Sequence, residues 1–286
     1  MLTFAPNKKI MASNINLKVY HGIEATVNAY IFSDDKSMVL VDGLRNSEEA
    51  TQLAKQIKEE GKPLTHMLIT HGHPDHYTGM NVIKNEFPDV QIVVTTDDIK
   101  KDIINFSTWM ESVGWLEKEP ALKPLSATNS SGFDYENKIS VLNNKQLQLA
   151  EGAVLELNSD YNAAECEHLT TIFSKDLNAF FANDFIYNGV HPWLAISQEN
   201  IENWKKQLQE FNSTFAQSQS TVYGGHGKPA DVAVFDKQLK YINDFEEVVA
   251  NATSREDAMQ KMQQLYPDYT QADFLLVYSV NAFVAE

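Results

Sequence analysis

The segment Thr70–His76 constrains this chain more than any other part of its sequence. It reads Thr-His-Gly-His-Pro-Asp-His and places three histidines and one aspartate within six consecutive positions. Residues 64–70 are apolar and β-branched, which predicts a buried strand, and Gly72 and Pro74 end that strand in a turn. Neutral imidazole and ionised carboxylate are ligands that suit zinc and its first-row neighbours. The segment therefore predicts a metal-binding loop at a strand end.

The composition of the chain argues against several other classes of protein. Its 286 residues are 43% hydrophobic, which is enough for a sizeable core. Because 39 acidic residues outnumber 23 basic ones, the net charge of −16 disfavours binding to a nucleic-acid backbone. The sequence has no apolar run of about 18 residues that could span a membrane. The single cysteine, Cys166, excludes an internal disulfide and a cysteine-built metal site. We therefore expect a small-molecule substrate, with no nucleic-acid or membrane partner.

The beginning of the chain leaves the compartment open. Residues 1–9 lack the apolar core of a signal peptide. A cytoplasmic protein and an exported protein whose signal has been removed would both start in this way. The sequence does not set the oligomeric state.

Strand and helix patterns alternate along the rest of the chain. Strands are expected over residues 15–20, 28–32, 37–41, 64–70, 90–95, 139–142, 146–149, 153–157, 170–173, 179–182 and 221–223. Helices are expected over residues 47–60, 79–87, 198–215, 231–249, 255–265 and 271–280. Residues 97–137 are rich in aromatic side chains, which indicates either a packed helical insertion or an aromatic wall over the metal site. We expect one domain over residues 1–286, with 97–137 as an insertion over the site and 231–286 as capping helices.

The order His71-Gly72-His73-Pro74-Asp75-His76 resembles the His-x-His-x-Asp-His signature of the metallo-β-lactamase superfamily. Further matching pieces follow at plausible positions along most of the chain, namely Val41-Asp42-Gly43, Phe181-Ala182-Asn183-Asp184 and Tyr223-Gly224-Gly225-His226-Gly227. This resemblance implies an α/β fold of the αββα type, in which two mixed β-sheets lie face to face with helices outside.

The resemblance also implies a site for two divalent metal ions. Zinc is the default ion, and iron or manganese suits the same ligands. Two histidines of the motif would bind the first metal, His71 and His73. Three residues would bind the second metal, Asp75, His76 and His226. The resemblance makes Asp184 the bridge between the two metals and Asp42 a support behind the ligands.

The third ligand of the first metal has two candidates, because the family's usual Gly-His-Thr is replaced by Asn162-Ala163-Ala164-Glu165-Cys166-Glu167-His168. Glu165 lies 19 positions before Asp184, a spacing found in several branches of the superfamily, and the alkylsulfatase-like branch uses a glutamate there. His168 lies 16 positions before Asp184 and carries the commoner ligand group. Register slightly favours Glu165, and ligand chemistry favours His168.

Two residues after Asp184 are candidates for binding the substrate. Tyr187 has the offset of a tyrosine in the lactonase-like branch, and His191 has the offset of a histidine in the alkylsulfatase-like branch. Each could hydrogen-bond a substrate oxygen or a developing oxyanion. The alternative is that both side chains only pack in the pocket wall.

The function implied by the resemblance is metal-dependent hydrolysis. A hydroxide shared by two metals would attack the carbonyl of an ester, lactone, thioester or amide. Asp184 would hold both metals, and Asp75 would also guide a proton. The alternatives are a sulfatase or phosphoesterase, an iron-dependent oxidoreductase, and a non-catalytic metal-binding protein.

Overall fold

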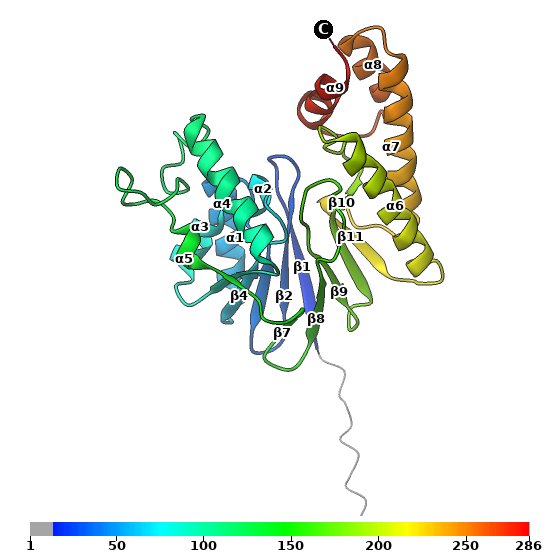
Figure 1. Cartoon of the computed structure of the whole chain (residues 1–286). Coiled ribbons are helices and arrows are strands. Elements are labelled where there is room, and N and C mark those ends of the chain that lie inside the picture. Colours follow the sequence, from blue (N-terminus) through cyan, green and yellow to red (C-terminus); the bar gives the residue numbers. More distant parts are fainter. Residues whose placement is uncertain (1–13, 286) are drawn as a thin grey trace, which may run out of the picture.

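Two mixed β-sheets lie face to face, and helices cover the outer face of each sheet (Figure 1). This computed structural model describes residues 14–285. The expectation for residues 1–9 lies outside that range. The observed architecture is the expected αββα sandwich. Among the described residues, no helix is long and apolar enough to cross a membrane.

The first sheet contains its six strands in the order of the sequence. They are β1 (Asn16–His21), β2 (Asn28–Ser33), β3 (Met38–Val41), β4 (Leu64–Leu68), β5 (Gln91–Val94) and β6 (Ile139–Val141). β1 to β3 pair antiparallel, and β3 to β6 pair parallel through helical crossovers. The helices between these strands are α1 (Ser47–Glu59), α2 (Pro74–Tyr77), α3 (Met80–Glu86), α4 (Asp97–Ser112) and α5 (Tyr135–Lys138).

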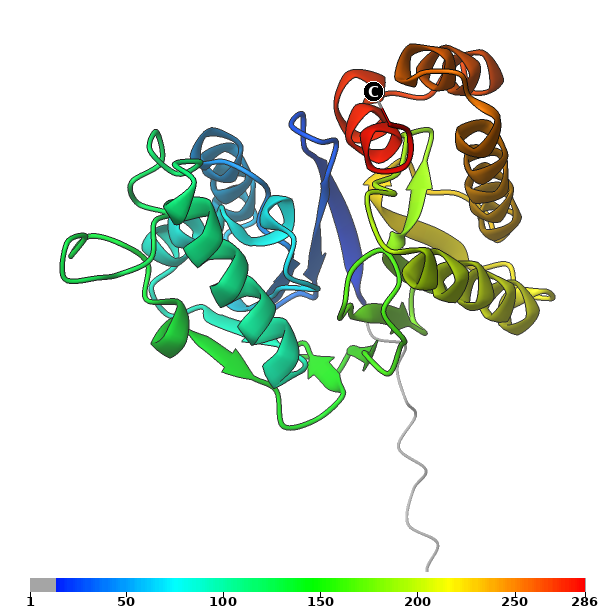
Figure 2. The same cartoon turned by 45° about the horizontal axis from the view of Figure 1, so that its top comes forward.

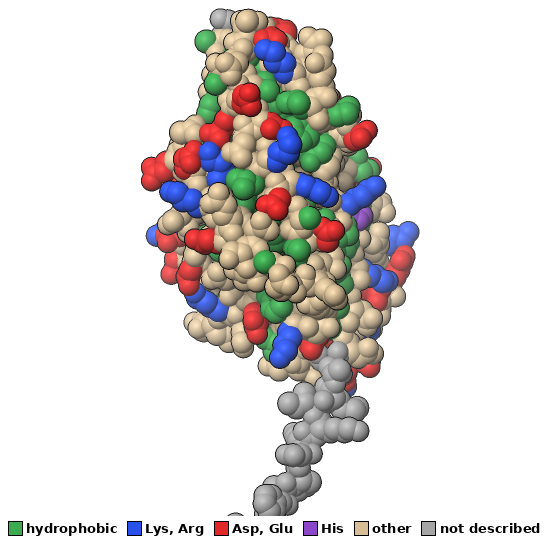
Figure 3. Space-filling view, turned by 90° about the vertical axis from the view of Figure 1, so that its right-hand side faces the viewer, with side chains coloured by type: hydrophobic (Ala, Val, Ile, Leu, Met, Phe, Trp, Pro, Cys, Tyr) green, Lys and Arg blue, Asp and Glu red, His purple; other side chains and the backbone are tan. Residues whose placement is uncertain are grey.

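The second sheet has the order β11-β10-β9-β8-β7. Its strands are β7 (Gln146–Gln148), β8 (Val154–Asn158), β9 (Thr171–Ser174), β10 (Ala179–Asn188) and β11 (Thr221–Gly227). β10 and β11 are parallel, and the other pairs are antiparallel. The later helices are α6 (Gln198–Phe215), α7 (Val234–Asn251), α8 (Arg255–Leu265), the π-helical turn η1 (Ala272–Leu276) and α9 (Val277–Phe283). On the side of the molecule that carries α6 and α7, acidic and basic side chains are interspersed (Figure 3).

The core follows from the alternation of side chains along buried strands. On β2, Tyr30 and Phe32 point between the two sheets, whereas Ala29 and Ile31 pack under the first helical layer. On the other side of the sandwich, Trp204 of α6 is fully buried, and its indole nitrogen donates to the Phe185 carbonyl of β10 at 3.0 Å. Both faces of each sheet are therefore covered, which fixes the strand ends that carry the site.

The structure differs from the sequence prediction at the end of one strand that matters for the site. β10 was expected to end at residue 182, but it continues to Asn188 past a β-bulge. Residues 97–112 form α4, a helix within the segment 97–137. Isolated bridges between His71 and Leu169 and between Val27 and His226 connect the two sheets at one end of the sandwich.

Candidate metal centre

The histidine motif follows the carboxyl end of β4, where the strand gives way to α2. Gly72 is required there, because a Cβ atom at this position would lie 2.6 Å from the Cβ atom of Asp102. Pro74 occupies the first position of α2, where its missing N–H costs no hydrogen bond. His73 therefore precedes the helix, and Asp75 and His76 lie on its first turn.

Four side chains form the first ligand group, and each offers one atom within 4.8 Å of the others: His71, His73, Glu165 and Asp184. The Nε2 atom of His71 lies 3.5 Å from Asp184 Oδ2, and the Nδ1 atom of His73 lies 3.4 Å from Glu165 Oε1. Glu165 comes from the loop between β8 and β9, and Asp184 comes from the middle of β10.

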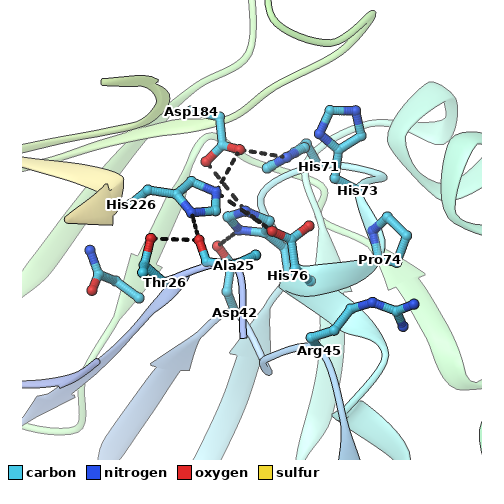
Figure 4. Close-up of polar contacts among 12 residues, drawn as sticks. Ala25, Thr26, Asp42, Arg45, His71, His73, Pro74, His76, Asp184 and His226 are labelled. Carbon is cyan, nitrogen blue, oxygen red and sulfur yellow. Dashed lines mark hydrogen bonds and ion pairs between the residues drawn. The ribbon is translucent and has the colours of Figure 1, made fainter. Parts of the chain in front are cut away.

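The second ligand group consists of Asp75, His76 and His226. The Nε2 atom of His226 lies 3.5 Å from Asp75 Oδ2. Asp184 also reaches this group, because its carboxylate oxygens lie 3.3 Å from the Nε2 atoms of both His76 and His226 (Figure 4). Asp184 therefore belongs to the first group and also lies within 3.3 Å of two histidines of the second.

The buried ligand atoms without hydrogen-bond partners suit the binding of divalent metal. Four ligand atoms are buried and have no hydrogen-bond partner in the described structure, namely His71 Nε2, His76 Nε2, Glu165 Oε2 and Asp184 Oδ1. Burying a polar atom without a partner costs about 1–3 kcal/mol, so four such atoms in one place need a compensating ligand. Imidazole nitrogens and carboxylate oxygens together are a donor set for zinc, iron or manganese.

The tautomers of three histidines are set by hydrogen bonds behind the site. The Nδ1–H of His226 donates to the Ala25 carbonyl at 2.7 Å, and Asp42 Oδ2 lies 2.7 Å from Nδ1 of His76. Thr70 donates its hydroxyl to Asp42 at 2.9 Å and can then accept from Nδ1 of His71 at 3.0 Å. In each ring the Nε2 lone pair is therefore left to face the site.

The pKa values of the ligand side chains are shifted by the charges of their neighbours. Burial lowers the pKa of His73, but the Glu165 carboxylate outweighs this effect and raises that pKa to about 9. Burial raises the pKa of Asp184, but the charges of His76, His226 and His71 together hold it well below its usual value. A metal that binds here must therefore displace protons, which makes its affinity depend on pH.

The strand that carries His226 needs glycine beside Asp184. A Cβ atom at Gly225 would lie 1.7 Å from Asp184 Oδ1, so no side chain fits. Asn183 adopts a left-handed conformation at φ 48°, and its amide donates to the Thr170 carbonyl of the neighbouring chain segment. These two residues turn the Asp184 carboxylate out of the strand and toward the histidines.

His168, the second candidate for the third ligand, lies outside both ligand groups. Its Nδ1 atom pairs with Asp102 Oδ2 at 2.8 Å, and its side chain is 43% exposed. Of the two candidates the structure brings Glu165 to the centre, because the loop folds back with Glu165 inward and His168 toward α4.

Tyr187 and His191 have different surroundings. The Tyr187 hydroxyl lies 2.9 Å from Asp184 Oδ2 and 3.1 Å from Glu165 Oε1, and its ring stacks on His226 at 4.4 Å. His191 does not line the cavity at the ligand groups. It is fully buried, with Nδ1 2.6 Å from the Tyr241 hydroxyl, and this packing corrects the expectation that it faces the substrate.

A cavity of about 310 Å³ opens beside the two ligand groups. Ligand-group side chains form its floor, namely His73, Asp75, Glu165, Asp184 and His226. Arg45, Glu24 and the Ala25 backbone also border the cavity, and sequence reasoning missed all three. No sequence pattern predicts that the backbone carbonyl of Ala25 accepts a hydrogen bond from a histidine. The φ of 54° at Ala25 shows that the chain makes an unusual turn there.

Comparisons with known proteins agree with the geometry. A family model described as the metallo-beta-lactamase superfamily matches residues 22–226. The chain is 29% identical over 73 residues to the uncharacterized protein YobT of Bacillus subtilis and 30% identical over 83 residues to a probable metallo-hydrolase of Streptococcus pyogenes. These matches span 25% and 28% of this chain, and 30% and 34% of the two relatives, so they cover about a third of each relative's length.

Among solved structures, a metallo-beta-lactamase from Pontibacter korlensis is similar with a TM-score of 0.54. The similarity covers 82% of this chain and 97% of that one at 15% identity, which shows the fold alone. The family model spans well over half of the chain and includes the histidine motif, Glu165, Asp184 and His226. This chain therefore belongs to the metallo-β-lactamase superfamily.

Proposed function

We propose that this chain is a hydrolase that uses two divalent metal ions to cleave a small carbonyl substrate. The observation that carries the proposal is the convergence of two ligand groups, with buried unpartnered atoms, on the floor of one cavity. Three residues would hold one metal, His71, His73 and Glu165. Three others would hold the second, Asp75, His76 and His226, with Asp184 shared between both metals.

Metals in such a site supply Lewis acidity and a water molecule of lowered pKa. The chain's own residues provide the remaining functions. Asp75 borders the cavity with its side chain 17% exposed, so its carboxylate can accept a proton from solvent or substrate. Burial raises the pKa of Tyr187 well above its usual value, so its hydroxyl stays protonated. The hydroxyl donates to Asp184 Oδ2 or Glu165 Oε1, and its proton could turn to a substrate oxygen if metals engaged those carboxylates.

The test combines metal analysis with a substrate screen. We expect plasma mass spectrometry of protein purified without added metal to find zinc, and we expect turnover of one carbonyl class. The screen covers a lactone, a thioester, a β-lactam, a phosphate ester and a sulfate ester. His73→Ala should lose metal and turnover together. His66→Ala is the matched control, because His66 lies on β4 outside both ligand groups and should leave both unchanged.

Other outcomes would favour the alternatives. Iron without hydrolysis would support an oxidoreductase, and bound metal without any turnover would support a metal-binding protein. Cleavage of only the phosphate or sulfate ester would support a phosphoesterase or sulfatase. Protein that binds no metal from an excess of zinc would overturn the proposal.

A further inference from the structure

The cavity has an apolar wall that metal binding does not require. Six apolar side chains form this wall, namely Phe106, Trp115, Trp193, Phe274, Leu275 and Tyr278. The first two come from α4 and the turn after it, over the first sheet. The last three come from η1 and α9, over the second sheet. Figure 2 shows α4 beside the first sheet and the red C-terminal helix α9 beside the second, so the wall is built from both halves of the sandwich.

Several of these side chains are exposed in a way that core packing does not explain. Trp115 is 51% exposed, Phe274 42% and Tyr278 47%. The Tyr278 ring nonetheless packs on its neighbours, because it meets Phe274 edge-on at 5.6 Å and Trp193 in a tilted arrangement at 5.6 Å. A fixed, exposed apolar surface beside a cavity is typical of a binding site for an apolar group.

Outside the ligand groups, the cavity offers little charge that could hold an anionic substrate. Among the described residues that line it, Arg45 is the only lysine or arginine, and its Nε atom lies 3.7 Å from a Glu24 carboxylate oxygen. Sites that transfer phosphoryl groups surround the charged oxygens with metal ions and with unpaired cationic side chains. Here the single cation is already offset, so outside the ligand groups the lining suits a neutral substrate.

We propose that the substrate is a neutral ester with an apolar acyl chain, and that this chain lies against Trp115, Phe274 and Tyr278. The inference rests on the proposed hydrolase function and names its substrate class. In the reaction a water oxygen bonds to the acyl carbon and the acyl C–O bond breaks. The products are a carboxylic acid, which ionises at neutral pH, and an alcohol that takes up a proton.

The first experiment measures kcat/KM for p-nitrophenyl acetate, butyrate and octanoate with the metal-loaded protein. Because each buried methylene adds about 0.8 kcal/mol of transfer free energy, we expect kcat/KM to rise about twofold to fourfold per methylene on this half-open surface. p-Nitrophenyl phosphate and p-nitrophenyl sulfate should react much more slowly. Phe274→Ala and Tyr278→Ala should flatten the dependence on chain length. Leu265→Ala should not, because Leu265 is 52% exposed but does not line the cavity.

A second experiment tests the wall without any reaction. Octanamide and acetamide are titrated calorimetrically into the protein after removal of metal. We expect octanamide alone to bind, with a negative heat-capacity change, and Phe274→Ala to weaken its binding while Leu265→Ala does not.

The two experiments separate the substrate inference from the hydrolase function. If neither the esters nor any compound of the wider screen is cleaved but octanamide binds as expected, the hydrolase function is wrong and the apolar-chain site stands. If a lactone, thioester or β-lactam is cleaved but no ester is, the ester class is overturned and the hydrolase function stands. If esters are cleaved at rates independent of chain length and octanamide does not bind, the apolar-chain site is overturned and the hydrolase function stands. Faster cleavage of the phosphate or sulfate would also overturn the substrate class.

Discussion

Asp42→Asn should weaken the binding of metal and leave the stability of the metal-free protein nearly unchanged. Asp42 is fully buried at φ 61°, a left-handed conformation that asparagine also tolerates. Its Oδ1 atom accepts from the Thr70 backbone N–H at 2.9 Å, and asparagine can keep this bond. Its Oδ2 atom, which meets the Thr70 hydroxyl and Nδ1 of His76, would become an NH₂ group that can only donate.

This reversal of hydrogen-bond direction acts on one histidine in each ligand group. A donor beside Nδ1 of His76 favours the tautomer that carries its proton on Nε2, and this proton blocks the lone pair that faces the site. The Thr70 hydroxyl also loses its acceptor, so it can turn its proton toward Nδ1 of His71 and shift that ring in the same way. Losing such an orienting partner costs about 10–100-fold in metal affinity, or about 1.4–2.7 kcal/mol.

The assay is competition for zinc against a chromophoric chelator, with thermal unfolding measured in excess chelator. We expect weaker binding at both metal positions and little change in the unfolding temperature without metal. Asp34→Asn is the control, because Asp34 is equally buried but lies in the turn between β2 and β3. It should lower stability without changing metal affinity. If Asp42→Asn binds zinc as tightly as the wild type does, the tautomer argument is wrong.

Three further predictions concern single residues. Glu165→Ala should lower the metal content per chain, measured by plasma mass spectrometry, whereas His168→Ala should not; the opposite result would reverse our ligand assignment. Gly225→Ala should displace Asp184 and lower zinc affinity in the same competition assay, so unchanged affinity would contradict the close approach. Burial lowers the pKa of His191 to about 4, so below pH 6.5 the unfolded chain binds a proton that the folded chain refuses. Stability should therefore fall by up to about 3 kcal/mol from pH 6.5 to 4, and urea unfolding of His191→Gln should lack this component.

The residue types of the site could be predicted because they belong to local patterns. His71, His73, Asp75 and His76 lie within one short loop, and the strand before them shows where that loop lies. Asp184 and His226 each stand in or at the end of an apolar run, which places them at one edge of the sandwich once the two sheets are formed. These predictions rest on residues that are close together in the sequence, and the structure brings the predicted side chains into the two ligand groups.

The choice between Glu165 and His168 could not be made from local pattern, because it depends on the path of a loop. His168 has the commoner ligand group, yet the loop directs it to Asp102 on α4. His191 was placed by its offset from Asp184, which matches a histidine of the alkylsulfatase-like branch. Since β10 continues to Asn188, the chain instead carries His191 behind the site to Tyr241.

Several backbone positions with positive φ lie next to residues that hold the ligands. Ala25, Asp42, Leu44 and Asn183 all have positive φ values without being glycine. For Ala25 and Leu44 this conformation costs about 1–2 kcal/mol, whereas aspartate and asparagine adopt it more readily. The Ala25 carbonyl holds His226, the Asp42 carboxylate holds His76, the Leu44 carbonyl accepts from the N–H of Gly79 after α2, and Asn183 precedes the shared carboxylate. Because strain of this kind persists only where surrounding structure enforces it, its placement beside three ligands, His226, His76 and Asp184, argues that the fold is built to fix them.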